Sequence, residues 1–392
     1  MSPVRAGARV CVLTPRGRGA VAVVRVWGPQ ALVVADAAFR PRRGPSLAET
    51  AAGRLRLGQM GAGIGDEVVA VVIASEPPEV EVYAHGGAAA VVLVVEALAA
   101  EGAELRRPVA WVRHDARAAI AAEALVDLAR APTVRTAEIL LEQAQGALVA
   151  DVREAIAALA DHPGEALDFV DDLLGRADVG LRLIDGWRVV LAGRPNVGKS
   201  RLLNALTGYD RAIVDATPGT TRDVVTARTA LEGWPVELAD TAGLRPSHDP
   251  IEALGVALAR ARQGEADLVL VVLDRSEPLT GIDRAIVSEH ARGLIVANKC
   301  DLPAAWNPAN LDAVAVAVSA QRGDGMEELV AAIASRLVPD CPPPSRGVPF
   351  RASQVRRLRA ARNALVAGDH GAAVRNLVAM CAELPRPFDR AD

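Results

Sequence analysis

The sequence predicts an α/β domain, with a mixed sheet and helices on both faces, that is inserted into an all-α helical domain and preceded by a small α+β domain. Strands and helices alternate from about residue 187 to 338, and helical periodicity fills the chain on either side of that stretch. Short β-branched runs separated by turn residues occupy the start of the chain. The predicted parts are an N-terminal domain, the first part of the helical domain, the α/β domain, and a shortened second part of the helical domain, at residues 1–114, 115–186, 187–340 and 345–392.

The bulk properties narrow the class of protein. A chain of 392 residues is long enough for two or three domains, each with its own core. The net charge of -4 gives no electrostatic reason for the body of the protein to bind nucleic acid, which leaves local basic patches as the alternative. Four scattered cysteines without a C-x-x-C pair fit a reducing cytoplasm. Because no apolar run reaches the roughly 18 residues of a membrane helix, we expect a cytoplasmic protein without a membrane partner.

The N-terminal domain is predicted from its strands, which have the β-branched runs 10–13, 21–26, 68–73 and 80–83. An alanine-rich helix is expected over 87–100. In the helical domain, Thr133 and Thr136 have the position of helix-start residues. A stiff proline linker at 341–344 closes the α/β domain, and two further helices are expected after it.

A phosphate-binding loop is indicated by Gly193–Ser200, which has the pattern G-x-x-x-x-G-K-S between an apolar strand and an amphipathic helix. Its glycines let several backbone N–H groups converge on a β-phosphate at the positive end of the helix. Lys199 would reach the β- and γ-phosphates. The Ser200 hydroxyl would ligate the bridging Mg²⁺.

The distribution of lysine adds a second argument. Of the 44 basic residues only Lys199 and Lys299 are lysines, and both fall in nucleotide motifs. Lys299 belongs to the run Asn298-Lys299-Cys300-Asp301, which follows an apolar strand and has the pattern N-K-x-D. The Asp301 carboxylate can accept hydrogen bonds from guanine N1–H and the exocyclic amine. Adenine has no such donor pair, so the nucleotide is predicted to be GTP.

Three further motifs follow in order. The run 213–223 has the position of a first switch loop, in which Thr221 would bind Mg²⁺ and the γ-phosphate only while GTP is present. The run 240–243 reads D-x-x-G and would hold the water shell of the metal. Ser319-Ala320-Gln321 would support the base. Each motif alone also fits turn or capping chemistry, but the ordered set predicts a P-loop GTPase domain with GTP and Mg²⁺ as cofactors.

One position departs from ordinary switch GTPases. Leu244 follows the D-x-x-G motif where a water-orienting glutamine would often stand, and leucine cannot orient water. Glu252 is the nearest candidate carboxylate for this role. A solvated acid at a helix start is the other reading of Glu252.

These motifs resemble the MnmE/TrmE tRNA-modification GTPases, most strongly from Val189 to Asp301. The runs 14–19, 24–28 and 84–87 match the first domain of that family, so the resemblance covers nearly the whole chain. It implies a homodimer formed by the first domain, which holds 5-formyl-tetrahydrofolate. It also implies a flavoprotein partner, action on the wobble uridine of tRNA, and GTP-dependent pairing of the G domains around a K⁺ ion that replaces an arginine finger.

By this resemblance Asn196 would ligate K⁺, together with the loop that contains Asp215, Thr217 and Thr220, and Glu252 would orient the attacking water. Thr221 and Glu252 are thus the expected catalytic residues. The expected GTP-binding residues are Asn196, Val197, Gly198, Lys199, Ser200, Arg201, Asp215, Thr217, Gly219, Thr220, Thr221, Asp240, Thr241, Ala242, Gly243, Asn298, Lys299, Asp301, Ser319, Ala320 and Gln321; the expected Mg²⁺ ligands are Ser200 and Thr221.

Two departures from the family leave the function open. The chain lacks the C-terminal Cys-x-Gly-Lys motif, and its last cysteine, Cys381, reads as a core residue of an apolar helix. Arg25 of the folate site is kept, but Pro77 stands where the family has an acid, and no lysine exists outside the GTP motifs. We therefore hold two hypotheses: a K⁺-stimulated tRNA-modification GTPase, or a divergent paralogue that acts as a regulatory GTPase switch without folate chemistry.

Overall fold

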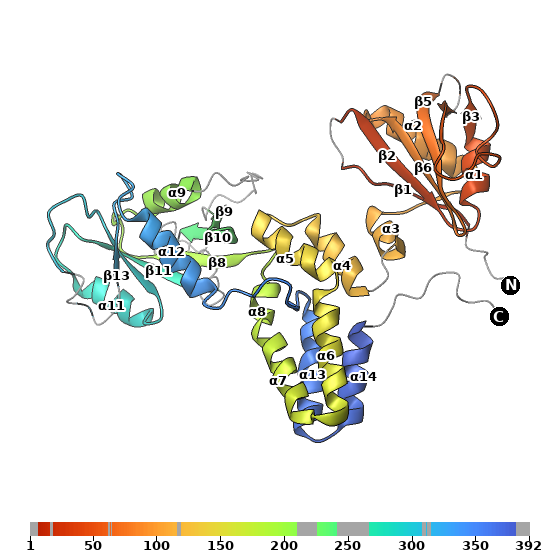
Figure 1. Ribbon diagram of the computed structural model, residues 1–392. Helices are drawn as coiled ribbons and strands as arrows, with labels where there is room; N and C mark the ends of the chain where they lie inside the picture. The colour runs from red at the N-terminus through yellow and green to blue at the C-terminus, as the bar shows by residue number, and fades with distance from the viewer. Residues whose placement is uncertain are drawn as a thin grey trace, which may run out of the picture. The chain divides into compact units, whose positions relative to one another are not determined.

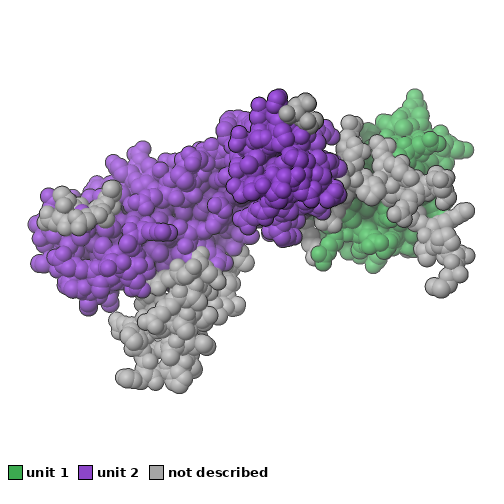
Figure 2. Space-filling model, turned by 90° about the horizontal axis from the view of Figure 1, so that it is seen from below, with its two compact units in different colours: residues 1–117, 384–392 green, residues 118–383 purple. Residues whose placement is uncertain are grey.

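The computed structural model describes residues 7–15, 19–61, 63, 65–115, 119–209, 226–240, 266–307, 311 and 315–381. The chain forms two compact units, which comprise residues 1–117 and 118–383 (Figure 2).

The first unit is a seven-stranded sheet with the order β3-β4-β5-β6-β2-β1-β7. Its strands pair antiparallel, except that β7 runs parallel to β1. The elements in chain order are β1 (Arg9–Val12), β2 (Val21–Trp27), α1 (Ala31–Ala38), β3 (Phe39–Pro41), β4 (Leu55–Met60), β5 (Asp66–Ser75), β6 (Pro78–His85), α2 (Ala88–Ala100), β7 (Glu104–Leu105) and α3 (Pro108–Asp115).

The core of the first unit lies between the sheet and helices α1 and α2. Alternate residues of the central strands, such as Val24 and Val82, pack against Val34 of α1 and Leu98 of α2. On α3, Trp111 joins a smaller cluster with Cys11 and Trp27. Because side chains alternate along a strand, the residues between the core positions form a second face of the sheet.

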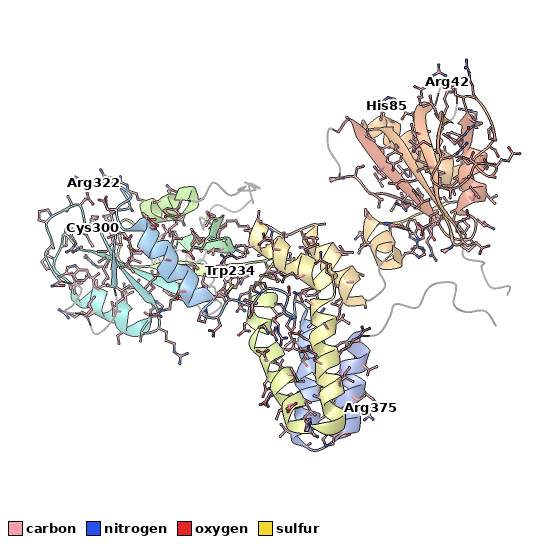
Figure 3. The ribbon with its side chains drawn as sticks, viewed as in Figure 1. Arg42, His85, Trp234, Cys300, Arg322 and Arg375 are labelled. Carbon is pink, nitrogen blue, oxygen red and sulfur yellow. The ribbon has the colours of Figure 1, made fainter. Side chains whose placement is uncertain are left out.

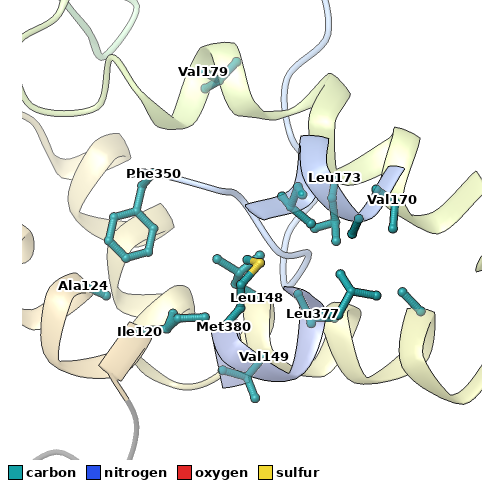
Figure 4. Close-up of a cluster of buried hydrophobic side chains, with 14 of the residues drawn as sticks. Ile120, Ala124, Leu148, Val149, Val170, Leu173, Val179, Phe350, Leu377 and Met380 are labelled. Atoms are coloured by element: carbon teal, nitrogen blue, oxygen red, sulfur yellow. The ribbon is translucent and has the colours of Figure 1, made fainter. Parts of the chain in front are cut away.

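The second unit contains the remaining helices and a second sheet (Figure 1). Its helices before the sheet are α4 (Ala119–Leu128), α5 (Val134–Ala144), α6 (Ala147–Asp161), α7 (Pro163–Gly175) and α8 (Ala177–Gly180), and those at its end are α13 (Ala352–Val366) and α14 (His370–Cys381). Both sets contribute to one hydrophobic core, where Leu148 and Leu173 lie beside Leu377 and Met380 (Figure 4). Thr133 caps α5 in a capping box with Thr136, as the sequence predicted. Cys381 is partly buried against this core, which confirms its assignment as a packing residue.

The sheet of the second unit has six strands in the order β13-β12-β11-β8-β10-β9. Among the described strands, β9 alone pairs antiparallel, with β10, so the sheet is mixed. Its elements in chain order are β8 (Trp187–Ala192), α9 (Lys199–Tyr209), β9 (Thr226–Leu231), β10 (Trp234–Asp240), β11 (Leu268–Asp274), α11 (Gly281–Glu289), β12 (Leu294–Asn298), β13 (Ala315–Ala317) and α12 (Met326–Leu337).

Helices cover both faces of this sheet. On one face Leu202 of α9 and Leu329 of α12 pack against the strands, and on the other Ile286 of α11 and Trp306 do so. The central strands β11 and β12 are apolar up to their last residue, as expected for parallel strands that are buried on both sides. The predicted mixed sheet with helices on both faces is therefore confirmed.

Two tryptophans connect the six-stranded sheet to the helical core. Trp187 opens β8 and Trp234 opens β10, and their rings meet edge to face with centroids 5.4 Å apart within that core. The turn before β10 is bound to the start of α5, because the hydroxyl of its N-cap residue Thr133 donates a hydrogen bond to the carbonyl oxygen of Gly233 at 2.7 Å. The Arg135 guanidinium lies over the Trp234 ring, 5.0 Å from its centroid. Within the described ranges, no helix has the length and apolar character needed to cross a membrane.

The shared core makes a prediction about stability. Leu358 of α13 is fully buried, so Leu358→Ala should lower the free energy of unfolding by about 2–5 kcal/mol. Val366 is 65% exposed at the end of the same helix, and Val366→Ala should change it by less than about 0.5 kcal/mol. Urea unfolding followed by circular dichroism measures both. Equal effects would show that α13 does not share the core of the helices before the sheet.

Candidate functional site

The phosphate loop lies between the end of β8 and the start of α9. Gly193 has φ 150° and approaches β11 so closely that a Cβ atom would lie 2.3 Å from the carbonyl oxygen of Val272. Gly198 has φ 99°, and a Cβ atom there would lie 2.3 Å from the amide nitrogen of Asn298. Glycine is required at both positions by conformation and by space. Asn196 has φ 66°, which asparagine tolerates better than most residues.

Lys199 is the first residue of α9, and its side chain folds back into the phosphate loop. Its ammonium group donates to the carbonyl oxygens of Gly193 at 2.9 Å and Arg194 at 2.8 Å. Burial lowers the pKa of Lys199, and the charge of Asp240 opposes that shift. The lysine is thus held at the centre of the loop that the sequence assigned to phosphate.

Ser200 at the start of α9 contacts Asp240 at the end of β10. The Ser200 hydroxyl donates to Oδ2 of Asp240 at 2.6 Å, and Asp240 is 5% exposed at the end of β10. Oxygen donors of this kind suit Mg²⁺. The Ser200 hydroxyl would bind the metal directly, and the Asp240 carboxylate would bind it through a coordinated water. The two residues therefore fit the metal that the fold implies.

Asn298 at the end of β12 connects three loops. Its amide nitrogen donates to the carbonyl of Val197 at 2.8 Å, and its amide oxygen accepts from the backbone N–H of Ala320 at 3.1 Å. The side chain is 2% exposed. The phosphate loop, the N-K-x-D run and the Ser319-Ala320-Gln321 run are consequently one connected site.

The next residue of this motif has a partner that sequence reasoning missed. The Lys299 ammonium lies 2.5 Å from the carboxylate of Asp274, which ends β11. Burial alone would raise the pKa of Asp274, but hydrogen bonds from Lys299 and Ser276 outweigh it and hold the pKa below its usual value. The carbonyl of Asp274 also accepts from Trp306 Nε1 at 2.8 Å. An acid at the end of an apolar strand was the signal available in the sequence.

Positive groups surround the carboxylate expected to bind guanine. A hydrogen bond with Ser319, followed by the charges of Arg322 and Arg201, holds the pKa of Asp301 below its usual value. Arg322 Nε lies 4.0 Å from that carboxylate, and Arg201 Nη1 donates to the side chain of Gln321 at 2.9 Å. Figure 3 labels Arg322 and Cys300 on the neighbouring loops at this end of the sheet. The carboxylate is kept ionised, as an acceptor of two guanine donors must be.

The structure thus brings together the described site residues at the carboxyl ends of the parallel strands, where open α/β sheets bind ligands. The remaining expected residues lie outside the described residues; they are Asp215, Thr217, Gly219, Thr220, Thr221, Thr241, Ala242, Gly243 and Glu252.

Arg194 is a second residue that sequence reasoning passed over. Its Nε donates to Asp283 at 2.7 Å, and its Nη2 lies 3.4 Å from Glu277. Asp283 is also the capping partner of Thr280 at the start of α11, and its side chain is 2% exposed. The phosphate loop is therefore tied to a helix cap that is itself fixed.

Arg25 in the first unit does not fit the folate role that the family resemblance implies. Its two terminal nitrogens lie 3.2 Å from Glu79 and 2.8 Å from Glu81. The ring of Trp111 covers its guanidinium at 4.4 Å, and His114 lies 3.5 Å from the other oxygen of Glu79. A guanidinium neutralised by two carboxylates offers no free cation to the anionic glutamate tail of a folate, so we derive no step through folate.

A glycine-rich loop around a buried lysine, with an asparagine-linked base site on a mixed α/β sheet, defines a P-loop GTPase. A family model described as 50S ribosome-binding GTPase matches residues 188–299. Proteins named tRNA modification GTPase MnmE are similar over most of the chain. That of Symbiobacterium thermophilum is 36% identical over 90% of this chain and 87% of its own length. That of Chloroflexus aurantiacus is 39% identical over 83% of this chain and 81% of its own length. The chain belongs to the MnmE family of GTPases.

The contact between Arg194 and Asp283 predicts a positioning effect. Charge-assisted hydrogen bonds contribute about 1.5–3 kcal/mol, so Arg194→Ala and Asp283→Asn should each weaken GTP binding roughly tenfold. Because the two residues act through one contact, the double variant should lose little more than either single variant. Titration with a fluorescent guanine nucleotide measures all three.

The matched control is Arg284→Ala, which removes an exposed guanidinium from the same helix. It should leave the affinity unchanged. Additive losses in the double variant would mean that the two side chains act on the nucleotide site separately.

Proposed function

We propose that GTP hydrolysis by this chain serves tRNA modification at the wobble uridine, together with a flavoprotein partner and in the cytoplasm. The carrying observation is that a connected guanine-nucleotide site occurs in a chain that matches tRNA modification GTPases over 80 to 90% of its length. The shared core of α4–α8 with α13 and α14 further supports a G domain inserted into a helical domain.

In this proposal Lys199 binds the β- and γ-phosphates, Ser200 and Thr221 ligate Mg²⁺, and Asp301 reads guanine. The K⁺ ion lies at Asn196, with Asp215, Thr217 and Thr220 around it, and Glu252 orients the attacking water. Hydrolysis then depends on charge stabilisation and positioning, as phosphoryl transfer generally does. The positive φ of Asn196 supports its part, because it marks a residue held in an uncommon backbone conformation beside the phosphates.

The first unit supports the homodimer. An apolar row crosses the sheet face opposite α1 and α2, in the register Leu57, Val69, Tyr83 and Val23. Leu57 is 42% exposed, the other three are half-buried, and Leu55 on the same face is 68% exposed. A sheet face of this kind gains free energy when a second copy covers it.

One observation favours the second hypothesis, a regulatory GTPase switch without folate-dependent chemistry. Arg25 is neutralised inside the first unit by Glu79 and Glu81. The GTP site and the helical core do not depend on that cluster, so a GTP cycle could persist without one-carbon chemistry. The two hypotheses differ in what the cycle drives.

Hydrolysis in K⁺ and Na⁺ buffers tests the cation. We expect turnover in K⁺ to exceed that in Na⁺ at least tenfold, a small part of the roughly 10³–10⁵ that an arginine finger supplies. Asn196→Gly should abolish the difference, because glycine adopts the positive φ without strain but has no amide ligand. The affinity of the Asn196→Gly variant for guanine nucleotide, measured in the same buffers, should stay within about threefold of that of the parent protein. Equal rates for the parent protein in the two buffers would rule out the K⁺ mechanism.

Modified-nucleoside mass spectrometry tests the modification role. Deleting the gene should remove the modification from wobble uridine, and re-expressing this chain should restore it. A Lys199→Ala chain should fail to restore it, because it lacks the phosphate-binding ammonium. Unchanged wobble uridine in the deletion strain would exclude the modification role and leave the regulatory switch.

A further inference from the structure

Basic and acidic residues are distributed unevenly among the helices of the second unit, which together form a bundle around the shared hydrophobic core. Residues 351–381, which comprise α13 and α14 and the residues beside them, contain six arginines and one aspartate, although the whole chain has a net charge of -4. The acids of the bundle lie mainly on α6 and α7, where Asp151, Asp171 and Asp172 pair with arginines. Net charge therefore conceals a local basic surface.

Within the part of the chain that the structure describes, four of these six arginines have no acidic partner, namely Arg356, Arg357 and Arg359 on α13 and Arg375 on α14. Arg351 pairs with Asp127 and Arg362 with Asp171, each at 2.6 Å. Arg356, Arg357 and Arg359 are exposed, and no ion pair joins any of them to an acid of the part of the chain that the structure describes. We call these three residues the α13 arginine face.

The position of this face on the helix makes it accessible. α13 buries Val355, Leu358, Ala361 and Leu365 against the bundle, which leaves the arginines on its outer side. Arg356 and Arg359 are three positions apart, a rise of only about 4.5 Å along the helix, so the three guanidinium groups lie within one turn. α14 packs against α13 and adds the exposed Arg375 (Figure 3).

We propose that the α13 arginine face binds the phosphodiester backbone of RNA. Guanidinium groups hold phosphate oxygens in bidentate geometry, and a row of them along a helix is the electrostatic footprint of nucleic-acid binding. The other exposed residues of α13 between Ala352 and Asn363 are small or polar. Hot spots of protein interfaces are enriched in Trp and Tyr as well as Arg, and neither aromatic residue occurs on α13.

The RNA partner is the one in the proposed function, but the argument depends on the charge of α13 and not on GTP. Contacts with phosphate fix the position of an RNA without reading its sequence. The exposed acids of α7, Glu165 and Asp168, would repel the same backbone. The RNA would thus be confined to the α13 side of this domain.

Binding of a fluorescent tRNA transcript to the full-length protein, measured by anisotropy at several KCl concentrations, tests the proposal. Each phosphate contact contributes about 0.7–0.9 to the slope of log K against log salt. A chain with Arg356→Gln, Arg357→Gln and Arg359→Gln should therefore lose about 2 to 3 units of slope. It should bind at least tenfold more weakly at low salt, with an unchanged circular dichroism spectrum.

The control chain carries Arg43→Gln, Arg54→Gln and Arg292→Gln, which remove the same charge from exposed positions elsewhere. It should keep the parental slope. Equal slopes in the α13 variant and the parent, or equal losses in both variants, would overturn the proposal. Competition by polyglutamate as effective as by RNA would assign the face to an acidic protein instead. If the parent protein binds RNA but does not hydrolyse GTP, the proposed function is refuted and the proposal for the α13 arginine face stands.

Discussion

The Asn298 side chain is the contact on which the nucleotide site depends. Its single amide group satisfies a carbonyl of the phosphate loop and a backbone N–H of the base loop, and it is almost fully buried. Leaving either partner unpaired would cost about 1–3 kcal/mol, so the three loops form as a unit. The parallel register of β8, β11 and β12 makes this possible, because it brings the three strand ends to one edge.

The opposite end of the same sheet is fixed just as firmly. Trp187 and Trp234 begin two strands whose other ends lead to the phosphate loop and to Asp240. Their rings lie within the helical core, and the turn before Trp234 is held by Thr133. β10 therefore extends from the helical core at Trp234 to the phosphate-loop end of the sheet at Asp240.

The charged clusters differ in whether their charges are neutralised. Arg25, Arg194 and Lys299 each lie against buried or half-buried carboxylates, so their role is to hold structure in place. The arginines on the outer side of α13 have no such partner among the residues that the structure describes. Pairing separates these roles, because a desolvated, paired charge is committed to its neighbour whereas a solvated one remains available to a ligand.

The sequence by itself determined the GTPase motifs, the strand-helix order, the helix start at Thr133 and the packing role of Cys381. These follow from local chemistry: glycines at positive φ, apolar periodicity, and side chains that cap their own backbone. Only the tertiary structure decided that Asp274 pairs with Lys299, that Asp283 holds Arg194, that Glu79 and Glu81 neutralise Arg25, and that Arg362 of α13 pairs with Asp171. Those contacts join residues that are 25 to 191 positions apart. Pairing between such distant side chains depends on the register of strands and the packing of helices, which local patterns do not encode.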